Sequence, residues 1–446
     1  MKKTLEEVAA KVASQKELLP FLYGDVDFSS TPHRFTDDLR DESSLRGELV
    51  GKRAEILSDK EQVGRIRAYT MLGDIVADAY AALMPEYGFK RLTAMLADAC
   101  DRGVENVEGA PRELIAFIRD MEHIPDWLDM NLVREGARID RNAAVNFSPY
   151  VVRGAFVATF MNKYAALPMA LTGTLSNQTA ANRVKETASF FATTVLPGGL
   201  DRYGPGFKAA ALVRLMHSMV RFNALKRSKQ WDIAVYGIPI PQVDQMPAGL
   251  IPIFILATRV LSKGRKEFTP QERARVELAR YRCYLLGLPE DLLADTPQGI
   301  VKVMSTRHAT LRMGYDDSTC GELLRATMAA YLPSDRSAGS RIFNSVEQSF
   351  AKVFFVRTFL SGDEKRAAQI GVHLSLKDRL LFAAVGLLVF SRMAAYSFAM
   401  RIPGIAGLAD RILVRKLNVL LKGYGHAEYT TDATKYKPAI IKAAGV

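Results

Sequence analysis

The segment FKAAALVRLMHSMVRFNAL, residues 207–225, decides the fold class. It is rich in Ala, Leu and Met, which favour the helical backbone, and it contains neither Gly nor Pro. Its polar positions are few, so most of the surface of such a helix would be apolar. The segment therefore predicts a helix near 206–226 that carries a small number of Arg and His side chains.

Helical periodicity continues outward from this segment in both directions. Apolar residues recur three to four positions apart from Val63 to Leu96, with a break at 85–88, and Pro111 suits the first turn of another helix. The prolines within 232–247 predict an extended loop over 232–243. Further helices are expected near 131–170, 177–195, 247–262, 270–286, 318–331, 343–360 and 376–399. Because no run of alternating β-branched residues is convincing, the fold class is predicted to be all-α.

Composition restricts the class of protein further. The chain has 446 residues, of which 48% are hydrophobic and 24% are charged, and these values exclude a disordered chain. Its three cysteines are widely scattered and predict buried free thiols rather than a disulfide framework or a metal knuckle. Sixty basic against 48 acidic residues give a net charge of +12, which favours an anionic partner without choosing its kind.

The polarity of the chain suggests three consecutive parts. Residues 1–60 are more polar and are expected to wrap the core, 61–400 form the main helical domain, and 401–446 form a basic amphipathic segment. The N-terminus has no apolar region of the secretory type, so a cytoplasmic location is expected. The apolar run at 380–391 is about 12 residues long, short of the ~20 that a spanning helix needs. It predicts a buried helix or a contact with one membrane leaflet.

Several familiar motifs can be set aside. The sequence PGGLDRYGPGF at 197–207 lacks the glycine spacing of a nucleotide-binding loop and predicts a turn between two helices. The six histidines include no pair four residues apart, so a helical two-histidine metal site is not supported. Lys and Arg are spread along the chain without a nucleic-acid-binding motif, and no nucleic-acid partner is expected.

One constellation points to a cofactor. Arg214, His217 and Arg221 lie at positions i, i+3 and i+7, so they project from one side of the predicted helix. Two arginines beside a histidine disfavour the charged imidazole, and a neutral imidazole is the form that binds iron. Arginines also pair well with the carboxylates of a haem. A haem between helices is one interpretation, and an exposed basic stripe with an ordinary histidine is the other.

A family resemblance joins this helix to its neighbours. The residues that carry it are Leu171-Thr-Gly-Thr-Leu175, Arg183-x-x-Glu186-Thr187, Pro197-Gly-Gly-Leu200, Gly204-x-Gly206 and Val213–Arg221, together with Ile124–Trp127, Trp231-Asp232 and Gly237-x-Pro239-x-Pro241-Gln242-x-Asp244. This pattern, which covers about 120–300, resembles the latex clearing protein family, whose superfamily includes the rubber oxygenases and the MpaB-type oxygenases.

The resemblance implies a globin-like helical core with additional N- and C-terminal helices and a non-covalent haem b (iron protoporphyrin IX). By position it implies that His217 is the iron ligand and that Arg183, Thr187, Arg214 and Arg221 hold the haem and its surroundings. It implies an oxidoreductase that uses dioxygen to cleave or oxygenate an unsaturated apolar small molecule of isoprenoid or lipid type.

The sequence also departs from the family pattern. Rubber-cleaving members carry Lys immediately before the Thr, whereas this chain has Glu186 before Thr187. No Asp or Glu occurs between Val152 and Lys185, where those members offer a carboxylate base. Glu186, Thr187 and Arg183 are therefore the candidate catalytic residues, with Glu186 as a proton shuttle. The alternative for Glu186 is a salt bridge to Arg183 at i,i+3.

Two alternatives to the oxygenase remain open. One is a haem-binding sensor or carrier without turnover, and the other is a cofactor-free helical protein that contacts a membrane surface. The segment 408–422 supports peripheral membrane contact, because its leucines gather on one side and its basic residues on the other. Packing of the same leucines on the core would explain that pattern as well.

Overall fold

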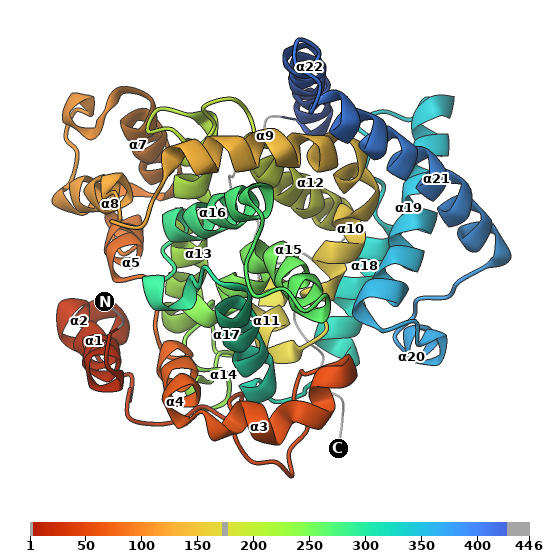
Figure 1. The fold of residues 1–446 in the computed structure, drawn as a ribbon. Coiled ribbons are helices and arrows are strands. Elements are labelled where there is room, and N and C mark those ends of the chain that lie inside the picture. Colours follow the sequence, from red (N-terminus) through yellow and green to blue (C-terminus); the bar gives the residue numbers. More distant parts are fainter. Residues whose placement is uncertain (1–2, 172–176, 426–446) are drawn as a thin grey trace. The chain divides into compact units, whose positions relative to one another are not determined.

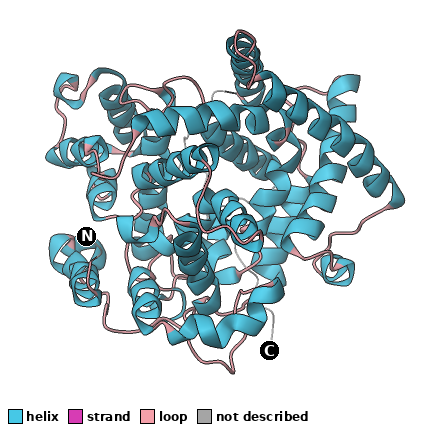
Figure 2. Ribbon diagram, in the orientation of Figure 1, coloured by secondary structure: helices cyan, strands magenta, loops and turns pink. Residues whose placement is uncertain are grey.

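The structure is a computed structural model, and it describes residues 3–171 and 177–425. Helices account for its regular structure, and the described residues contain no strand beyond the isolated bridges Phe35–Leu311 and Ser43–Arg312 (Figures 1 and 2). The prediction of an all-α fold is confirmed.

The helices before residue 200 are α1 Leu5–Leu18, α2 Pro20–Tyr23, η1 Gly47–Lys52, α3 Arg53–Ser58, α4 Lys60–Tyr69, α5 Ile75–Ala81, α6 Met84–Tyr87, α7 Phe89–Arg102, η2 Val104–Asn106, α8 Arg112–Glu122, α9 Met130–Asn146, α10 Ser148–Ala158, α11 Lys163–Leu171 and α12 Asn177–Thr193. Those that follow are α13 Pro205–Lys226, α14 Ile233–Tyr236, α15 Gln242–Ser262, α16 Pro270–Leu285, η3 Glu290–Leu292, α17 Pro297–Thr310, η4 Asp317–Gly321, α18 Glu322–Ala329, α19 Ala338–Phe359, α20 Glu364–Gln369, α21 Leu376–Ala399 and α22 Ala406–Tyr424.

The chain divides into two compact units. Unit 1 comprises Met1–Phe147, Phe190–Met313 and Ser391–Leu421, and unit 2 comprises Ser148–Ser189, Gly314–Phe390 and Lys422–Val446. Each unit combines segments that are distant in the sequence, whereas the sequence suggested divisions at residues 60 and 400. Separate behaviour of those three consecutive parts stays a prediction.

Unit 1 is built on close helix contacts. Helix α9 packs along α16, and a Cβ at Gly136 would lie 2.2 Å from the carbonyl oxygen of Ala274, so only glycine permits this approach. An ion pair of 2.6 Å between Asp140 and Arg275 adds a polar contact beside the crossing. The N-terminal α1 packs on α4 through buried Val8 and Val12.

Unit 2 is organised around a buried ion pair between α10 and α19. Arg153 and Glu347 have no exposed side-chain surface, and the guanidinium lies 2.7 Å from the carboxylate. Arg153 also donates to the carbonyl oxygens of Thr327 and Ala330, at 2.7 and 2.8 Å. These carbonyls lie at the C-terminal end of α18, where a carbonyl no longer has a backbone N–H of the same helix four residues later. One arginine therefore donates to these carbonyls and also balances a buried carboxylate.

The predicted start of α15 was wrong, because a proline was taken to exclude a helix. The sequence predicted a loop over 232–243 and a helix from 247, but α15 begins at Gln242 and includes Pro247. Proline has no N–H to donate to the carbonyl four residues earlier, which is that of Val243. The Nε of Arg307 donates to this oxygen instead, at 3.2 Å. A side chain from α17 thus compensates for the proline, and the helix can start earlier.

The apolar run at 380–391 lies in a largely exposed helix. It lies inside α21, which has 24 residues, and the apolar window of this helix is 11% buried. Within the described chain, α21 is the one helix that is long and apolar enough to cross a membrane, judged by length and composition alone. The alternative of a buried helix was wrong, because most side chains of this helix have none of the described chain packed over them. The other alternative, a contact with one membrane leaflet, stays a prediction.

Candidate functional site

A glycine turn places the start of the helix that carries His217. The segment 194–204 connects α12 to α13, and Gly206 donates from its backbone N–H to the Gly199 carbonyl at 2.7 Å. A Cβ at Gly204 would lie 2.2 Å from the Gly198 oxygen, so side chains would force the turn open. The glycines therefore serve close backbone packing, and the prediction of a turn between two helices is confirmed.

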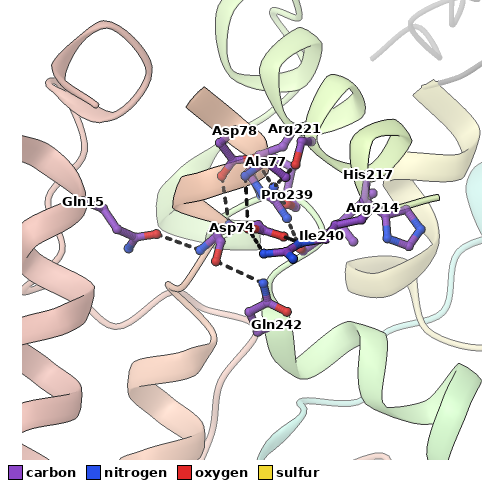
Figure 3. A network of polar contacts seen from close by, with 12 residues as sticks. Gln15, Asp74, Ala77, Asp78, Arg214, His217, Arg221, Pro239, Ile240 and Gln242 are labelled. Atoms are coloured by element: carbon purple, nitrogen blue, oxygen red, sulfur yellow. Dashed lines mark hydrogen bonds and ion pairs between the residues drawn. The ribbon is translucent and has the colours of Figure 1, made fainter. Parts of the chain in front are cut away.

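The two arginines that flank His217 are buried and paired with aspartates. Arg214 lies 2.6 Å from Asp74 and 2.7 Å from Asp120, and Arg221 is fully buried against Asp78. Figure 3 shows the contacts with Asp74 and Asp78, between α13 and the start of α5. The alternative of an exposed basic stripe is therefore wrong, because exposures of 5% and 0% place both guanidinium groups in the interior.

The aspartates supply the negative charge that these arginines need. Burial acts to raise the pKa of Asp74, but the charge and hydrogen bonds of Arg214 outweigh it and hold the pKa below its usual range. The Tyr23 hydroxyl donates to Asp78 at 2.5 Å, and burial raises the pKa of that tyrosine well above its ordinary value. Burial raises the pKa of Asp78, and the charge of Arg221 opposes this rise. Each aspartate is thus held by an arginine, and the pKa values of the two carboxyl groups shift in opposite directions.

Arg221 also holds the loop that leads into α15. Its guanidinium donates to the carbonyls of Pro239 and Ile240, at 2.9 and 2.7 Å. Ile240 has a φ of 47°, in the left-handed region that a β-branched residue seldom adopts. The contacts with Arg221 fix this strained turn, and the chain then enters α15 at Gln242.

A chain of side-chain amides runs from a backbone carbonyl to His217. Gln242 Nε2 lies 3.2 Å from the Gly73 oxygen, Gln245 Nε2 lies 2.7 Å from Gln242 Oε1, and Gln245 Oε1 lies 3.1 Å from His217 Nδ1. Gln242 is also held by its backbone N–H, which donates to the Leu72 carbonyl at 3.0 Å. Both glutamines are buried.

This relay determines the tautomer of the histidine. A backbone carbonyl can only accept, so Gln242 must donate to Gly73 and turn its own oxygen to Gln245. Gln245 then donates with its nitrogen and presents its oxygen to His217, so Nδ1 must carry a proton and donate. In the neutral ring the lone pair is then on Nε2, which is the arrangement typical of a histidine that ligates a metal.

The remaining candidate residues lie on α12, in unit 2. The Arg183 guanidinium is 3.1 Å from the Glu186 carboxylate, at i,i+3, so the salt bridge considered from the sequence is present. Burial raises the pKa of Glu186, and the charge and hydrogen bond of Arg183 oppose this without cancelling it. Thr187 is half-buried. His217 belongs to unit 1, whereas Arg183, Glu186 and Thr187 belong to unit 2. The two groups of candidate residues are therefore described separately.

The donor set fits an iron that receives one ligand from the protein. The described residues contain no group of three or more His, Cys, Asp or Glu side chains that could hold a metal ion. His217, whose ring is fixed by an amide oxygen, would hold the iron of a haem through Nε2. Arg214 and Arg221 fit a role as partners of the haem carboxylates less directly. Their positive charges are already balanced by Asp74 and Asp78. Roles of these arginines in binding the haem stay predictions.

Sequence reasoning missed the aspartates and the glutamines. Asp74 and Asp78 are four residues apart at the start of an otherwise apolar helix, and Gln242 and Gln245 are three apart in the first turn of α15. Each pair shares a helix face, which was the available signal. The other described histidines lie elsewhere. His308 is the most perturbed of them, since burial first and the charge of Arg307 second lower its pKa to about 3.

Comparisons with known proteins identify the family. Residues 148–389, more than half of the chain, match the family described as "ER-bound oxygenase mpaB/B'/Rubber oxygenase, catalytic domain". A solved structure, latex clearing protein LCP in the closed state, shares the fold with a TM-score of 0.54 and 16% identity, over 79% of this chain and 91% of that one. The curated proteins contain no match. The chain belongs to the family of ER-bound MpaB-type and rubber oxygenases.

Proposed function

We propose that the protein is a haem-b-dependent oxygenase that uses dioxygen to cleave or oxygenate an unsaturated apolar small molecule. The family supports an oxygenase, and the amide relay to His217 supports the cofactor. The relay is the observation that carries the proposal, because it places the proton of His217 on Nδ1 and leaves the Nε2 lone pair as in a metal-ligating histidine. His217 Nε2 is the atom that would bind the haem iron.

The roles of the surrounding residues follow from their contacts. A haem bound here would supply the activation of dioxygen. Gln245 holds the proton on His217 Nδ1 and fixes the plane of the ring. Arg214 and Arg221 lock α13 to α5, so the helix that carries the ligand cannot rotate freely. The positive charges of both arginines are balanced within their own ion pairs.

The α12 residues are proposed to handle protons. The raised pKa of Glu186 lets its carboxyl group hold a proton at a pH where an exposed glutamate has lost it. Arg183 positions this carboxyl group through the 3.1 Å contact, and the Thr187 hydroxyl is one turn away from Arg183 on the same helix. Glu186 stands where rubber-cleaving members have Lys, which favours a smaller isoprenoid or lipid-like substrate over polymeric rubber.

The test uses purified full-length protein, reconstituted with hemin where necessary. Wild type is expected to show a Soret band and to consume oxygen with an unsaturated isoprenoid or lipid. The variant His217→Ala is expected to lose the haem, whereas His123→Ala, a change at an exposed histidine, should retain it. Haem binding without oxygen consumption would favour the sensor or carrier, and a colourless protein would favour the cofactor-free alternative. A cytoplasmic location stays a prediction.

A further inference from the structure

Helix α21 carries a continuous row of exposed apolar side chains. Leu376, Leu380, Leu387 and Phe398 are 72%, 62%, 76% and 66% exposed, and Ala383 and Ala394 between them are exposed as well. Their spacing of three, four or seven residues places them along one face of a helix. We call these six residues the outer row. Large apolar side chains in such an arrangement mark a surface that contacts another apolar phase.

Residues outside the outer row attach α21 to the protein near each of its ends. In unit 2, the Phe382 ring lies 4.5 Å from that of Phe350, and Lys377 donates to Ser345 at 3.0 Å. In unit 1, Asn142 Nδ2 donates to the carbonyl of Met393 and to the Ser397 hydroxyl, at 2.8 and 3.0 Å. A helix attached at both ends through one side cannot be surrounded by lipid, although its 24 residues would extend about 36 Å.

The charges around the outer row are basic. Between Leu376 and Gly425 the chain has eight Lys or Arg and two Asp, a net charge of +6 by count. The two aspartates are engaged, Asp378 with Ser375 at 2.7 Å and Asp410 with Arg141 at 2.6 Å. Arg392 and Arg401 are exposed, so their guanidinium groups can reach anionic groups next to the row. This charge pattern complements anionic lipid headgroups.

Helix α22 accounts for less of such a surface than its sequence indicated. Ala409, Leu413 and Leu417 are buried in unit 1, so this side of α22 packs on protein. Leu408 and Val419 remain exposed, at 52% and 65%. Of these two helices, it is therefore mainly α21 whose apolar surface is not covered by the part of the chain that the structure describes.

We propose that the outer row of α21 docks on an anionic phospholipid bilayer, with the helix lying in the plane of one leaflet and Arg392 and Arg401 among the headgroups. A helix placed in this way buries its apolar side to the depth of the headgroup boundary, while its other side stays on the protein. This inference does not depend on the haem, so it can fail or succeed independently of the proposed oxygenase.

The experiment is vesicle flotation of purified full-length protein. Vesicles of phosphatidylcholine with about one-third phosphatidylserine are compared with vesicles of phosphatidylcholine alone. Wild type is expected to float with the anionic vesicles. The variant Leu380→Ser/Leu387→Ser is expected to bind roughly 100-fold more weakly, and Arg392→Gln/Arg401→Gln roughly 30-fold more weakly, at about 5-fold per charge. The control Leu18→Ser/Ile115→Ser changes exposed apolar residues on α1 and α8 and should bind like wild type.

Four results would overturn the proposal. They are absence of wild-type binding to anionic vesicles, equal binding by the outer-row variant, binding that alkaline carbonate cannot reverse, and a wild-type dimer in light scattering that the outer-row variant converts to a monomer. The third would show a spanning helix, and the fourth would show that a second copy of the chain covers the row. Circular dichroism of each variant verifies that loss of binding does not come from loss of the fold.

Discussion

Removal of the Arg221 guanidinium should cost a large part of the stability of the protein. Arg221 and Asp78 are both fully buried, and Arg221 also donates to the carbonyls of Pro239 and Ile240. In Arg221→Met the carboxylate of Asp78 keeps Tyr23 as a partner but loses its counter-charge. Breaking one side of a buried ion pair costs about 3–5 kcal/mol. The two abandoned carbonyls and the strained Ile240 place the expected loss at the upper end of that range.

The assay is urea denaturation followed by circular dichroism at neutral pH. The matched control is Arg259→Met, which removes an exposed guanidinium from α15 and should change the free energy of unfolding by no more than about 0.5 kcal/mol. The double variant Asp78→Asn/Arg221→Met should lose less than the sum of the two single variants, because it leaves no unpaired charge. A loss below about 1 kcal/mol in Arg221→Met, or additive losses, would refute the role given to this pair.

The other predictions concern the relay and two titrating groups. Gln245→Leu should weaken haem binding about 10- to 100-fold and shift the iron–histidine vibration in resonance Raman spectra; unchanged spectra would remove Gln245 from the site. Because the folded-state pKa of Glu186 is raised, its contribution to stability is present below the unfolded pKa and is lost as pH rises through the folded value. Glu186→Gln should abolish that decline, and a persisting decline would assign it to another group. The pKa of His308 is lowered to about 3, so its contribution is present above about 6.5 and is lost as pH falls from there, by at most about 1.4 kcal/mol per pH unit. His308→Gln should flatten the curve between pH 5 and 6.5, and the same slope as wild type would contradict the assignment.

Local helix signals predicted much of the fold. Helix α13 was expected near 206–226 and is observed at Pro205–Lys226, because its composition and the glycine turn before it agree. The expected helix over 131–170 is instead three helices, α9, α10 and α11, and its apolar spacing gave no sign of the breaks. The early start of α15 also escaped prediction, since it depends on a hydrogen bond from Arg307 to Val243, 64 residues away.

The candidate site was predicted only in part, because its residues come from distant segments of the chain. His217, Arg214 and Arg221 were selected from their spacing on one helix, and the structure shows that the arginines are buried. Their partners Asp74 and Asp78 lie about 140 residues earlier, so helix periodicity could not connect them. Gln245 lies 28 residues after His217, and its role is visible only when the direction of each hydrogen bond is followed from Gly73.

The exposure of α21 could not be predicted from its own sequence. The sequence indicated an apolar run at 380–391, and an apolar run that short is most often buried. Whether a face is covered depends on which helices pack beside it. Here α21 makes its protein contacts through residues such as Phe382 and Met393, and the outer row is left exposed.

The absorption spectrum of the purified protein shows whether His217 binds a haem iron. It should be recorded for oxidised protein, for dithionite-reduced protein and for the reduced protein with carbon monoxide, after reconstitution with hemin. We expect a Soret band that shifts on reduction and again on addition of carbon monoxide. His217→Ala should lose this band while it retains the helical circular dichroism. A wild-type protein that stays colourless with hemin, or a His217→Ala variant with the wild-type spectrum, would contradict it.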